Sequence, residues 1–433
     1  MKYWNEKIET MPVEEMRKLQ LENLKKTLKW VYEKVPYYKN KFDEAGFKPE
    51  DLHNLEGLSK LPFTAKTDLR DNYPFGLCAV PLSEVVRIHA SSGTTGKPIT
   101  GPYTQSDLDQ WTECMARNLY AAGVRSNDIC QNAYGMGLLT GGLGFHQGAT
   151  RIGCAVIPIS SGQTERQIIV MQDFGVTVLF STPTYALTIA ERAEEMGVKI
   201  KDLPVRLGVF GGEPWTLAMR KEIEQRLGIK AMEAYGLTES GGPGTAFDCV
   251  AQDGLHLNED QFIAEIIDPD TGNVLPLGTK GELVFTSIQR QAMPLVRYRT
   301  RDITTLKREK CECGRTLLKM DEIYGRSDDM LFIAGVSVFP SQVESILLDV
   351  KEIEPQYVII VKRKGYSDQL HVDVEARQET YDAGPKRIAE VEKTVEGKIR
   401  GVIGIGIKVR LVPPKSITRS EGKPKRVIDE RKM

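Results

Sequence analysis

Apolar positions along the chain repeat with two different periods. Residues 12–34 carry apolar side chains at helical spacing, separated by charges, which predicts an amphipathic helix near the start of the chain. Its apolar positions are Met16, Leu19, Leu24, Leu28 and Val31. From about residue 85 to 240, short apolar runs alternate with helical segments, and this predicts a parallel sheet joined by crossover helices. The runs lie at 128–134, 155–158, 176–180 and 207–210.

The rhythm changes in the rest of the chain. Between 255 and 310, strand-like runs are separated by turns rich in Gly, Pro and Asp, which predicts a smaller, mostly antiparallel subdomain. After Gly325 we expect a compact α+β unit. Its expected strands lie near 356–361, 370–374 and 406–412, and its expected helices near 341–349 and 386–400. The predicted fold class is therefore α/β plus α+β, with an N-terminal domain over 1–324 and a small, mobile C-terminal lid domain over 325–433.

The composition is that of a large globular protein. The chain has 433 residues, of which 41% are hydrophobic and 27% charged, with a formal net charge of −1. Nothing in this balance indicates disorder or a polyanion-binding surface, so we expect no nucleic-acid partner. The first residues lack the apolar core of a signal peptide, and no run approaches the ~20 apolar residues of a membrane helix. Seven cysteines, an odd number, favour a reducing compartment. We expect a cytoplasmic protein without a membrane partner.

One segment has the composition of a phosphate-binding loop. It consists of Ser91, Ser92, Gly93, Thr94, Thr95, Gly96, Lys97 and Pro98. Glycines let backbone N–H groups approach phosphate oxygens, hydroxyls add donors, and a lysine adds positive charge. The segment is not a Walker A loop, because Ser91 and Pro98 stand where that loop needs Gly and Ser or Thr. The alternative is a polar surface turn.

Four later segments complete this pattern. They are Tyr235-Gly236-Leu237-Thr238-Glu239, Tyr298-Arg299-Thr300-Arg301-Asp302, Gly325-Arg326-Ser327-Asp328-Asp329 and Arg419-Ser420-Glu421-Gly422-Lys423. In this order they resemble the acyl-adenylate-forming (ANL) superfamily. Within it, residues 292–302 and 329–344 and the short total length resemble the phenylacetate-coenzyme A ligase family. The resemblance covers nearly the whole chain, from Trp4 to Lys423.

The resemblance implies a site for ATP or AMP. Thr238 and Glu239 follow an apolar run, so they should emerge at the carboxyl edge of the parallel sheet, where ligands bind. We expect the Thr238 hydroxyl on the α-phosphate and the Glu239 carboxylate on Mg²⁺. The alternative for Glu239 is an exposed loop charge. By resemblance, the adenine pocket is lined by Gly211, Gly212, Glu213, Ala234, Tyr235 and Gly236.

Three more charged residues gain roles from the resemblance. Asp302 resembles the carboxylate that accepts hydrogen bonds from both ribose hydroxyls, with Arg326 beside it. The alternative is an ion-pair cluster, since residues 298–302 carry three charges. Lys423 would otherwise read as a tail lysine. By resemblance, its ammonium stabilises the charge that gathers between the acid and the α-phosphate during adenylation.

The resemblance also implies a lid that turns between two half-reactions. The loop that carries Lys423 would block coenzyme A from the acyl-adenylate, so the lid must rotate. Asp328 matches the hinge position, within a hinge at 325–329. After rotation, Gly335 would line the pantetheine tunnel, where a missing side chain leaves room. The alternative for Gly335 is an ordinary hairpin turn.

A glycine-rich segment after the first predicted parallel strand resembles the acid-binding segment of the family. Its pocket residues are Tyr134, Gly135, Met136, Leu139 and Gly141. Met136 and Leu139 stand where the resemblance leads us to expect aromatic side chains. A larger or differently shaped aryl acid than phenylacetate is compatible with a flexible methionine and an aliphatic wall.

Three cysteines and one of the five histidines form a separate pattern. Six residues separate Cys249 from His256, and one separates Cys311 from Cys313, with Gly314 following as in metal-binding knuckles. Such a set of ligands makes a closed, tetrahedral zinc site. The spacing is looser than paired CxxC motifs, so buried reduced cysteines are the alternative.

The sequence as a whole predicts an ATP- and Mg²⁺-dependent acid–thiol ligase. It would make an acyl-adenylate and pyrophosphate, then acyl-coenzyme A and AMP, from phenylacetate or a related aryl acid. The resemblance alone implies a homodimer and a place in phenylacetate catabolism. One alternative is a nucleotidyltransferase of the deazaflavin-adenylylating type, which transfers AMP to a hydroxyl. Another is a zinc-braced nucleotide-binding protein without turnover.

Overall fold

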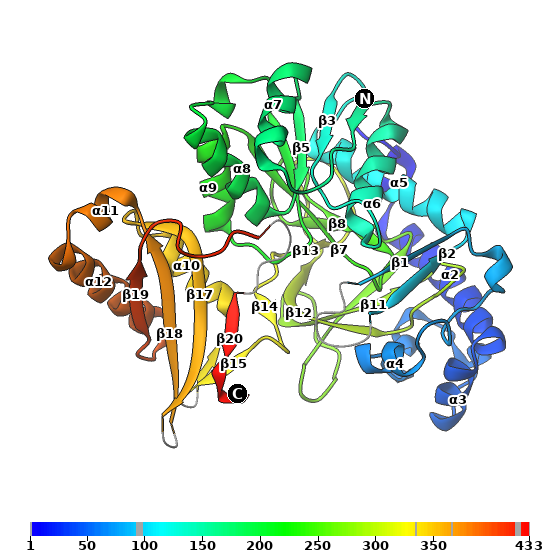
Figure 1. Ribbon diagram of the computed structural model, residues 1–433. Coiled ribbons are helices and arrows are strands. Elements are labelled where there is room, and N and C mark those ends of the chain that lie inside the picture. Colours follow the sequence, from blue (N-terminus) through cyan, green and yellow to red (C-terminus); the bar gives the residue numbers. More distant parts are fainter. Residues whose placement is uncertain (1, 92–97, 334–335, 365–366, 421–425, 433) are drawn as a thin grey trace.

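A large and a small unit make up the chain, each with its own sheet and core (Figure 1). The computed structural model describes residues 2–91, 98–333, 336–364, 367–420 and 426–432. Most of the predicted phosphate loop (92–97), Gly335 and Lys423 lie outside the described residues.

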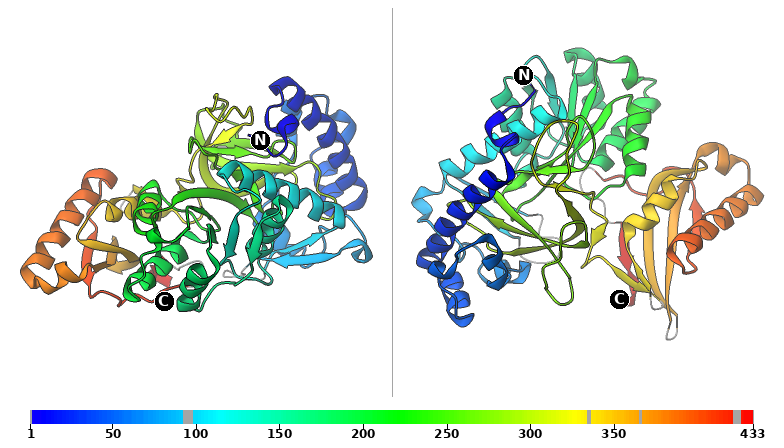
Figure 2. Two further views of the ribbon diagram at one scale, coloured as in Figure 1. Left: turned by 90° about the horizontal axis from the view of Figure 1, so that it is seen from above. Right: turned by 180° about the vertical axis from the view of Figure 1, so that it is seen from behind.

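Helices at the N-terminus cover the side of the large unit that faces away from the small unit (Figure 2). They are α1 (Glu6–Glu9), α2 (Val13–Lys34), α3 (Pro36–Glu44) and α4 (Lys66–Asp71). The predicted amphipathic helix is α2, whose Leu24, Leu28 and Val31 are fully buried. It ends before Pro36, because proline disfavours helical backbone at the preceding residue. A hairpin of β1 (Arg87–Ala90) and β2 (Thr100–Tyr103) follows.

Within the described residues, one sheet of twelve strands organises the large unit. Its parallel part has the order β4-β3-β5-β6-β7. These strands are β3 (Ile129–Asn132), β4 (Ala155–Ile157), β5 (Val178–Ser181), β6 (Leu207–Phe210) and β7 (Lys230–Leu237). The apolar runs between 128 and 210 thus became parallel strands, as predicted.

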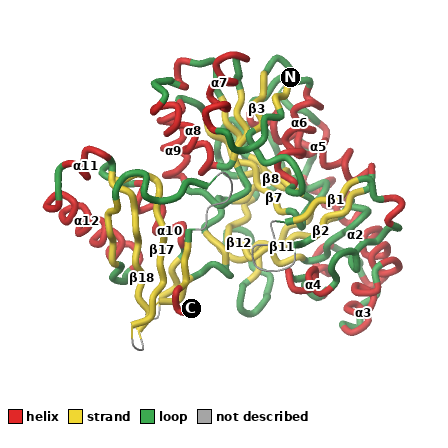
Figure 3. Tube along the Cα trace, in the orientation of Figure 1, coloured by secondary structure: helices red, strands yellow, loops and turns green. Residues whose placement is uncertain are grey.

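Helices cover both faces of the parallel strands (Figure 3). They are α5 (Gln105–Ala122), α6 (Thr140–Ile152), α7 (Thr164–Phe174), α8 (Pro183–Glu195) and α9 (Leu217–Leu227). Val178 and Phe180 of β5 pack with residues of α5 and α6, whereas Leu179 between them packs with residues of α7, α8 and α9. Because successive strand residues face opposite sides, each parallel strand is apolar on both faces.

The antiparallel strands continue the same sheet. They are β8 (Gly242–Phe247), β9 (Leu255–Leu257), β10 (Phe262–Ile267), β11 (Lys280–Ser287), β12 (Tyr298–Lys307), β13 (Lys319–Met320) and β14 (Gly325–Arg326). The antiparallel strands predicted between 255 and 310 are confirmed, but they do not form a sheet of their own, because β8 turns back directly beside β7 and extends the sheet from there.

The small unit packs helices on a sheet of order β19-β18-β17-β20. Its strands are β17 (Ile353–Lys364), β18 (Ser367–Ala376), β19 (Lys408–Val412) and β20 (Val427–Asp429), and a hairpin of β15 (Leu331–Ile333) and β16 (Val336–Val338) precedes them. Its helices are α10 (Pro340–Leu348), α11 (Gln378–Asp382) and α12 (Pro385–Ile403). The strands and helices expected here are all present. In the part of the chain that the structure describes, no helix has the length and apolar character needed to span a bilayer.

Candidate active site

Loops from three strands of the parallel part meet at one edge of the sheet. Tyr134 follows β3, Gly211 follows β6 and Thr238 follows β7, so each lies at the carboxyl end of its strand. This edge is where open α/β sheets bind ligands. The Tyr134 hydroxyl donates a hydrogen bond to the Gly211 carbonyl oxygen at 3.2 Å. The predicted acid segment and the predicted adenine segment are therefore in direct contact.

The predicted adenine segment is built from close backbone approaches. A Cβ at Gly211 would lie 2.1 Å from the carbonyl oxygen of Ala234, so only glycine fits beside β7. Glu213 accepts a hydrogen bond from the backbone N–H of Thr184 at 2.7 Å, in the first turn of α8. A carboxylate is favourable at the positive end of a helix. Glu213 thus stabilises the start of α8, a role that the sequence analysis did not predict. Burial raises the pKa of Glu213.

Asp302 is the centre of a hydrogen-bonded chain across three strands. It is 3% exposed, its Oδ2 accepts from the Tyr235 hydroxyl at 2.5 Å, and its Oδ1 accepts from Arg326 at 2.9 Å. Arg326 also donates to both oxygens of Asp328, at 3.0 and 3.1 Å. Burial and the Asp302 carboxylate raise the pKa of Tyr235 well above its usual range, so its hydroxyl stays a donor. The predicted ribose residue and the predicted hinge residue are thus linked through one guanidinium.

Thr238 and Glu239 lie in the turn between β7 and β8. The Gly241 N–H donates to the Thr238 carbonyl oxygen at 3.2 Å. A Cβ at Gly101 of β2 would lie 3.7 Å from the same oxygen, so the β1–β2 hairpin runs beside this turn. Ser91 is at the neck of that hairpin, where its hydroxyl accepts from the Ile99 N–H at 2.9 Å. The ends of the predicted phosphate loop are therefore next to the predicted phosphate-binding threonine.

The Glu239 side chain is almost fully buried. It is 6% exposed, and its Oε1 lies 3.8 Å from the ammonium of Lys66 on α4. Arg290 donates to the Glu239 carbonyl oxygen at 3.0 Å. Sequence reasoning missed both cations, and neither belongs to a segment that carried the resemblance. The exposed-charge alternative for Glu239 is wrong.

The acid segment presents apolar side chains to solvent at this edge. Leu138 is 59% and Leu139 47% exposed, although both are leucines next to the core. The Leu138 carbonyl oxygen accepts from the Ala90 N–H at 2.9 Å and lies 3.0 Å from Nδ1 of His89. Tyr134 stacks on Phe145, with ring centroids 4.6 Å apart. Exposed aliphatic groups on an anchored loop are suited to contact with an apolar ligand.

Sequence comparisons place the chain among known enzymes. The AMP-binding enzyme family matches residues 15–292, and the AMP-binding enzyme C-terminal domain matches residues 335–431. Phenylacetate-coenzyme A ligase of Thermus thermophilus is 47% identical over 98% of this chain and 99% of its own length. The Pseudomonas putida enzyme of the same name is 49% identical over 98% of this chain and 96% of its own length. The chain belongs to the phenylacetate-coenzyme A ligase family. The predicted family, fold class and acid–thiol ligase activity are confirmed.

Solved structures show which arrangement of the two units this family member adopts. 2-Hydroxyisobutyryl-CoA ligase in the postadenylation state, with 2-HIB-AMP, matches at a TM-score of 0.95 and 28% identity, over 100% of this chain and 93% of that chain. The same ligase with 2-HIB-AMP and CoA in its thioesterification state matches at 0.74 and 29% identity, over 99% and 92%. The higher score means that the small unit sits on the large one as in the postadenylation state.

Arg419 makes one of the contacts between the two units. It donates to both carboxylate oxygens of Glu191 on α8, at 2.8 and 2.6 Å, and to both of Glu375 on β18, at 2.6 and 2.9 Å. Lys415 forms an ion pair with Glu195 nearby. A cavity of about 750 Å³ lies between α7, α8 and residues 415–419. Arg419 is in the segment that carried the resemblance, but no signal in the sequence pointed to its partners.

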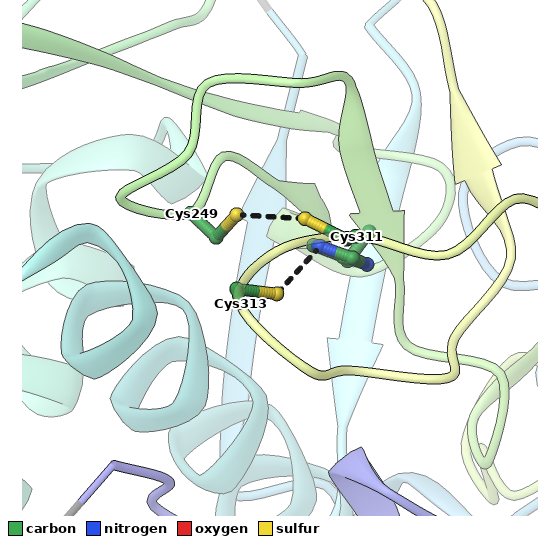
Figure 4. Close-up of side chains that lie close together, drawn as sticks. Cys249, Cys311 and Cys313 are labelled. Carbon is green, nitrogen blue, oxygen red and sulfur yellow. Dashed lines mark hydrogen bonds between the residues drawn. The ribbon is translucent and has the colours of Figure 1, made fainter.

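The four predicted zinc ligands come together. Figure 4 shows the three cysteines pointing toward one another. Cys249 Sγ lies 3.6 Å from Cys311 Sγ, and Cys313 Sγ lies 3.3 Å from Nε2 of His256. All four side chains are buried, and their ligand atoms lie within 4.8 Å of one another. Hydrogen bonds from Cys249 and His256 lower the pKa of Cys313. These four residues therefore suit a metal ion that is bound by cysteine thiolates and a histidine nitrogen.

Proposed function

We propose that this chain joins phenylacetate or a related aryl acid to coenzyme A through an acyl-adenylate, using ATP and releasing pyrophosphate and AMP. The observation that carries the proposal is the hydrogen bond from Tyr134 to Gly211, because it puts the acid segment beside the nucleotide segment. Adenylation needs an acid and an α-phosphate held within reach of each other.

In the first half-reaction the large unit holds the nucleotide. The Asp302 carboxylate accepts hydrogen bonds from the ribose hydroxyls. The Thr238 hydroxyl binds the α-phosphate, together with the loop that begins at Ser91. Glu239 would hold Mg²⁺, because it is a buried carboxylate directly after Thr238, and among the described residues the Lys66 ammonium lies 3.8 Å from its Oε1. When bound, Mg²⁺ neutralises phosphate charge. Lys423 stabilises the charge that develops between the acid and the α-phosphate.

In the second half-reaction the lid, residues 325–433, turns at 325–329 relative to residues 1–324. Asp328 is the hinge, and the turn removes the lysine loop from the path of coenzyme A. Gly335 then lines the channel for the pantetheine arm. The known relative that has been solved in both a postadenylation and a thioesterification state supports such a motion in this family.

The acid is proposed to be an aryl acid. Relatives at 47–49% identity carry the name phenylacetate-coenzyme A ligase, and the exposed Leu138 and Leu139 offer an aliphatic wall to an apolar ring. Met136 adds a flexible side chain that adapts to ring shape. The pocket therefore favours phenylacetate or an analogue of different shape over a polar acid.

A panel of aryl and aliphatic acids tests the proposal. Pyrophosphate release is measured with each acid, with and without coenzyme A, and the acyl-coenzyme A product is identified by mass. We expect pyrophosphate with aryl acids alone and a thioester only when coenzyme A is added. AMP transferred to a hydroxyl acceptor instead would favour the nucleotidyltransferase alternative. A chain that binds ATP but releases no pyrophosphate with any acid would be a binding protein.

Three further expectations complete the proposal. A homodimer is inferred from the resemblance, and sedimentation analysis of the purified chain tests it. A cytoplasmic location follows from the sequence and is tested by fractionation. The ligation needs no zinc, so a metal at the Cys/His cluster would serve the fold and not the chemistry.

A further inference from the structure

The Cys/His cluster lies in a part of the fold that the ligation does not use. Asp302 is in the middle of β12, and the strand continues for five more residues, about 17 Å of extended chain, before the loop with Cys311 and Cys313. Cys249 comes from the loop after β8, and His256 from β9. Side chains from three separate stretches of chain therefore converge on one buried point.

The separations of the ligand atoms match a tetrahedral zinc centre. Zn–S bonds of about 2.3 Å and a Zn–N bond of about 2.0 Å place two sulfurs about 3.8 Å apart and a sulfur about 3.5 Å from a nitrogen. The observed separations are 3.6 Å for Cys249 and Cys311 and 3.3 Å for Cys313 and His256. Four protein ligands leave no position open for a reacting water, which is the pattern of structural zinc sites.

The loop that carries two of the cysteines also holds the N-terminal segment. The Tyr3 hydroxyl donates to the Cys313 carbonyl oxygen at 3.2 Å, and the Thr316 N–H donates to the Glu9 carbonyl oxygen at 3.1 Å. The side chains of Arg315 and Glu9 form an ion pair of 2.5 Å, at 2% and 0% exposure. The Arg315 backbone N–H lies 3.5 Å from Cys313 Sγ and donates to it. The position of the N-terminal segment thus depends in part on the conformation of this loop, beside the bond of Trp4 to Glu113 on α5.

Apolar packing connects the same parts. Cys249, Cys311 and Cys313 belong to one buried cluster with Met11 and Met16, which lie just before and within α2. The loop itself has little regular structure between β12 and β13, so backbone hydrogen bonds alone define it weakly. A bond from each cysteine to a common ion would supply the missing constraint.

We propose that Cys249, His256, Cys311 and Cys313 bind one Zn²⁺ ion, and that this zinc fastens the N-terminal segment to the large unit. No thiol is oxidised, and each coordinating cysteine gives up its proton on binding. Removal of the metal frees the loop from 311 to 316, and with it residues 3–11, while the nucleotide residues on β7 and β12 stay in place.

Metal analysis of the full chain is the first test. Protein purified without chelator from zinc-supplemented medium is expected to hold one zinc per chain, and Cys313→Ser is expected to lose most of it. Cys114→Ala, which changes a buried cysteine on α5 outside the cluster, is the matched control and should keep the zinc. Because Cys313→Ser could fold poorly, Co²⁺ exchanged into the wild-type protein gives a second measurement. Thiolate-to-cobalt charge-transfer absorption is expected there.

Limited proteolysis tests the fastening. Chelation of the zinc should raise the rate of cleavage within residues 2–12 at least tenfold, and added Zn²⁺ should reverse this. Wild-type protein without zinc and without cobalt–thiolate absorption would overturn the metal site. A disulfide between Cys249 and Cys311 in that protein would overturn it as well. Zinc loss without faster cleavage in residues 2–12 would overturn the fastening role.

Discussion

Replacing Glu191 by Gln tests whether the contact of Arg419 with the large unit supports adenylation. Glu191 is the large unit's partner of Arg419, whereas Glu375 belongs to the lid itself. The change removes one charge from the contact between the units and leaves the ion pair within the lid intact. Since Arg419 stands four residues before Lys423, this contact holds the base of the loop that carries the proposed catalytic lysine.

The size of the effect follows from burial and geometry. Arg419 and Glu191 are 20% and 23% exposed, and two hydrogen bonds join them. A hydrogen bond to a charged group contributes about 1.5–3 kcal/mol, and the amide oxygen of Gln retains part of it. We expect a loss of about 1–2 kcal/mol, which corresponds to adenylation slower by roughly 5- to 30-fold.

The assay separates the two half-reactions. Single-turnover pyrophosphate release without coenzyme A measures adenylation, and conversion of supplied acyl-adenylate with coenzyme A measures thioester formation. Glu191→Gln should slow the first and spare the second. Glu165→Gln is the control, because Glu165 is exposed and pairs with Arg192 inside the large unit. Equal loss in both half-reactions, or the same loss in the control, would refute the reasoning.

Three further predictions concern the nucleotide site, the hinge and pH. Lys423→Ala should abolish adenylation and largely spare thioester formation from supplied acyl-adenylate, and equal loss in the two assays would contradict its role. Asp328→Pro should stall thioester formation while adenylation continues, because a fixed φ prevents the lid from turning; Asp328→Ala, which removes the carboxylate but leaves φ free, should turn over faster than the proline variant. Burial raises the pKa of Glu233 to about 7, although the nearby Arg220 lowers it and Asp248 raises it further. The native state therefore binds more protons than the unfolded state between about pH 4.5 and 7, and the free energy of unfolding falls as pH rises through that window. Glu233→Gln should flatten the decline of the thermal midpoint between pH 5 and 8 by the equivalent of at most about 3 kcal/mol, and an unchanged decline would exclude the shift.

The elements with strong periodicity were predictable from the sequence. α2 carries apolar residues at helical spacing, and the parallel strands are short continuous apolar runs, so burial of those residues decides their structure. The chemistry of the sheet edge was predictable in part. Polar residues such as Thr238 directly follow apolar strands, and parallel strands bring their carboxyl ends to one place.

Contacts that depend on tertiary placement were not predictable. Glu191 and Arg419 are 228 positions apart, and an exposed helix carboxylate looks the same with or without a partner. Lys66 reaches Glu239 only because α4 packs beside the β7–β8 turn. Strands of two or three residues, such as β13 and β20, are too short to show a period. For the cysteines, spacing suggested one cluster, but only the fold shows that the sulfurs meet.

The bonds of Arg326 bear on the order in which products leave. One amino group of its guanidinium holds Asp302, and Nε with the other amino group holds Asp328, so both carboxylates share one rigid plane. In the proposed mechanism, a turn of the backbone at Asp328 moves that carboxylate away, and the guanidinium plane then rotates relative to the ribose proposed to bind at Asp302. The proposed contacts between the nucleotide and Asp302 would therefore differ before and after the lid moves. We expect AMP to dissociate readily only after the lid has rotated, so that the acyl group is transferred to coenzyme A before AMP leaves.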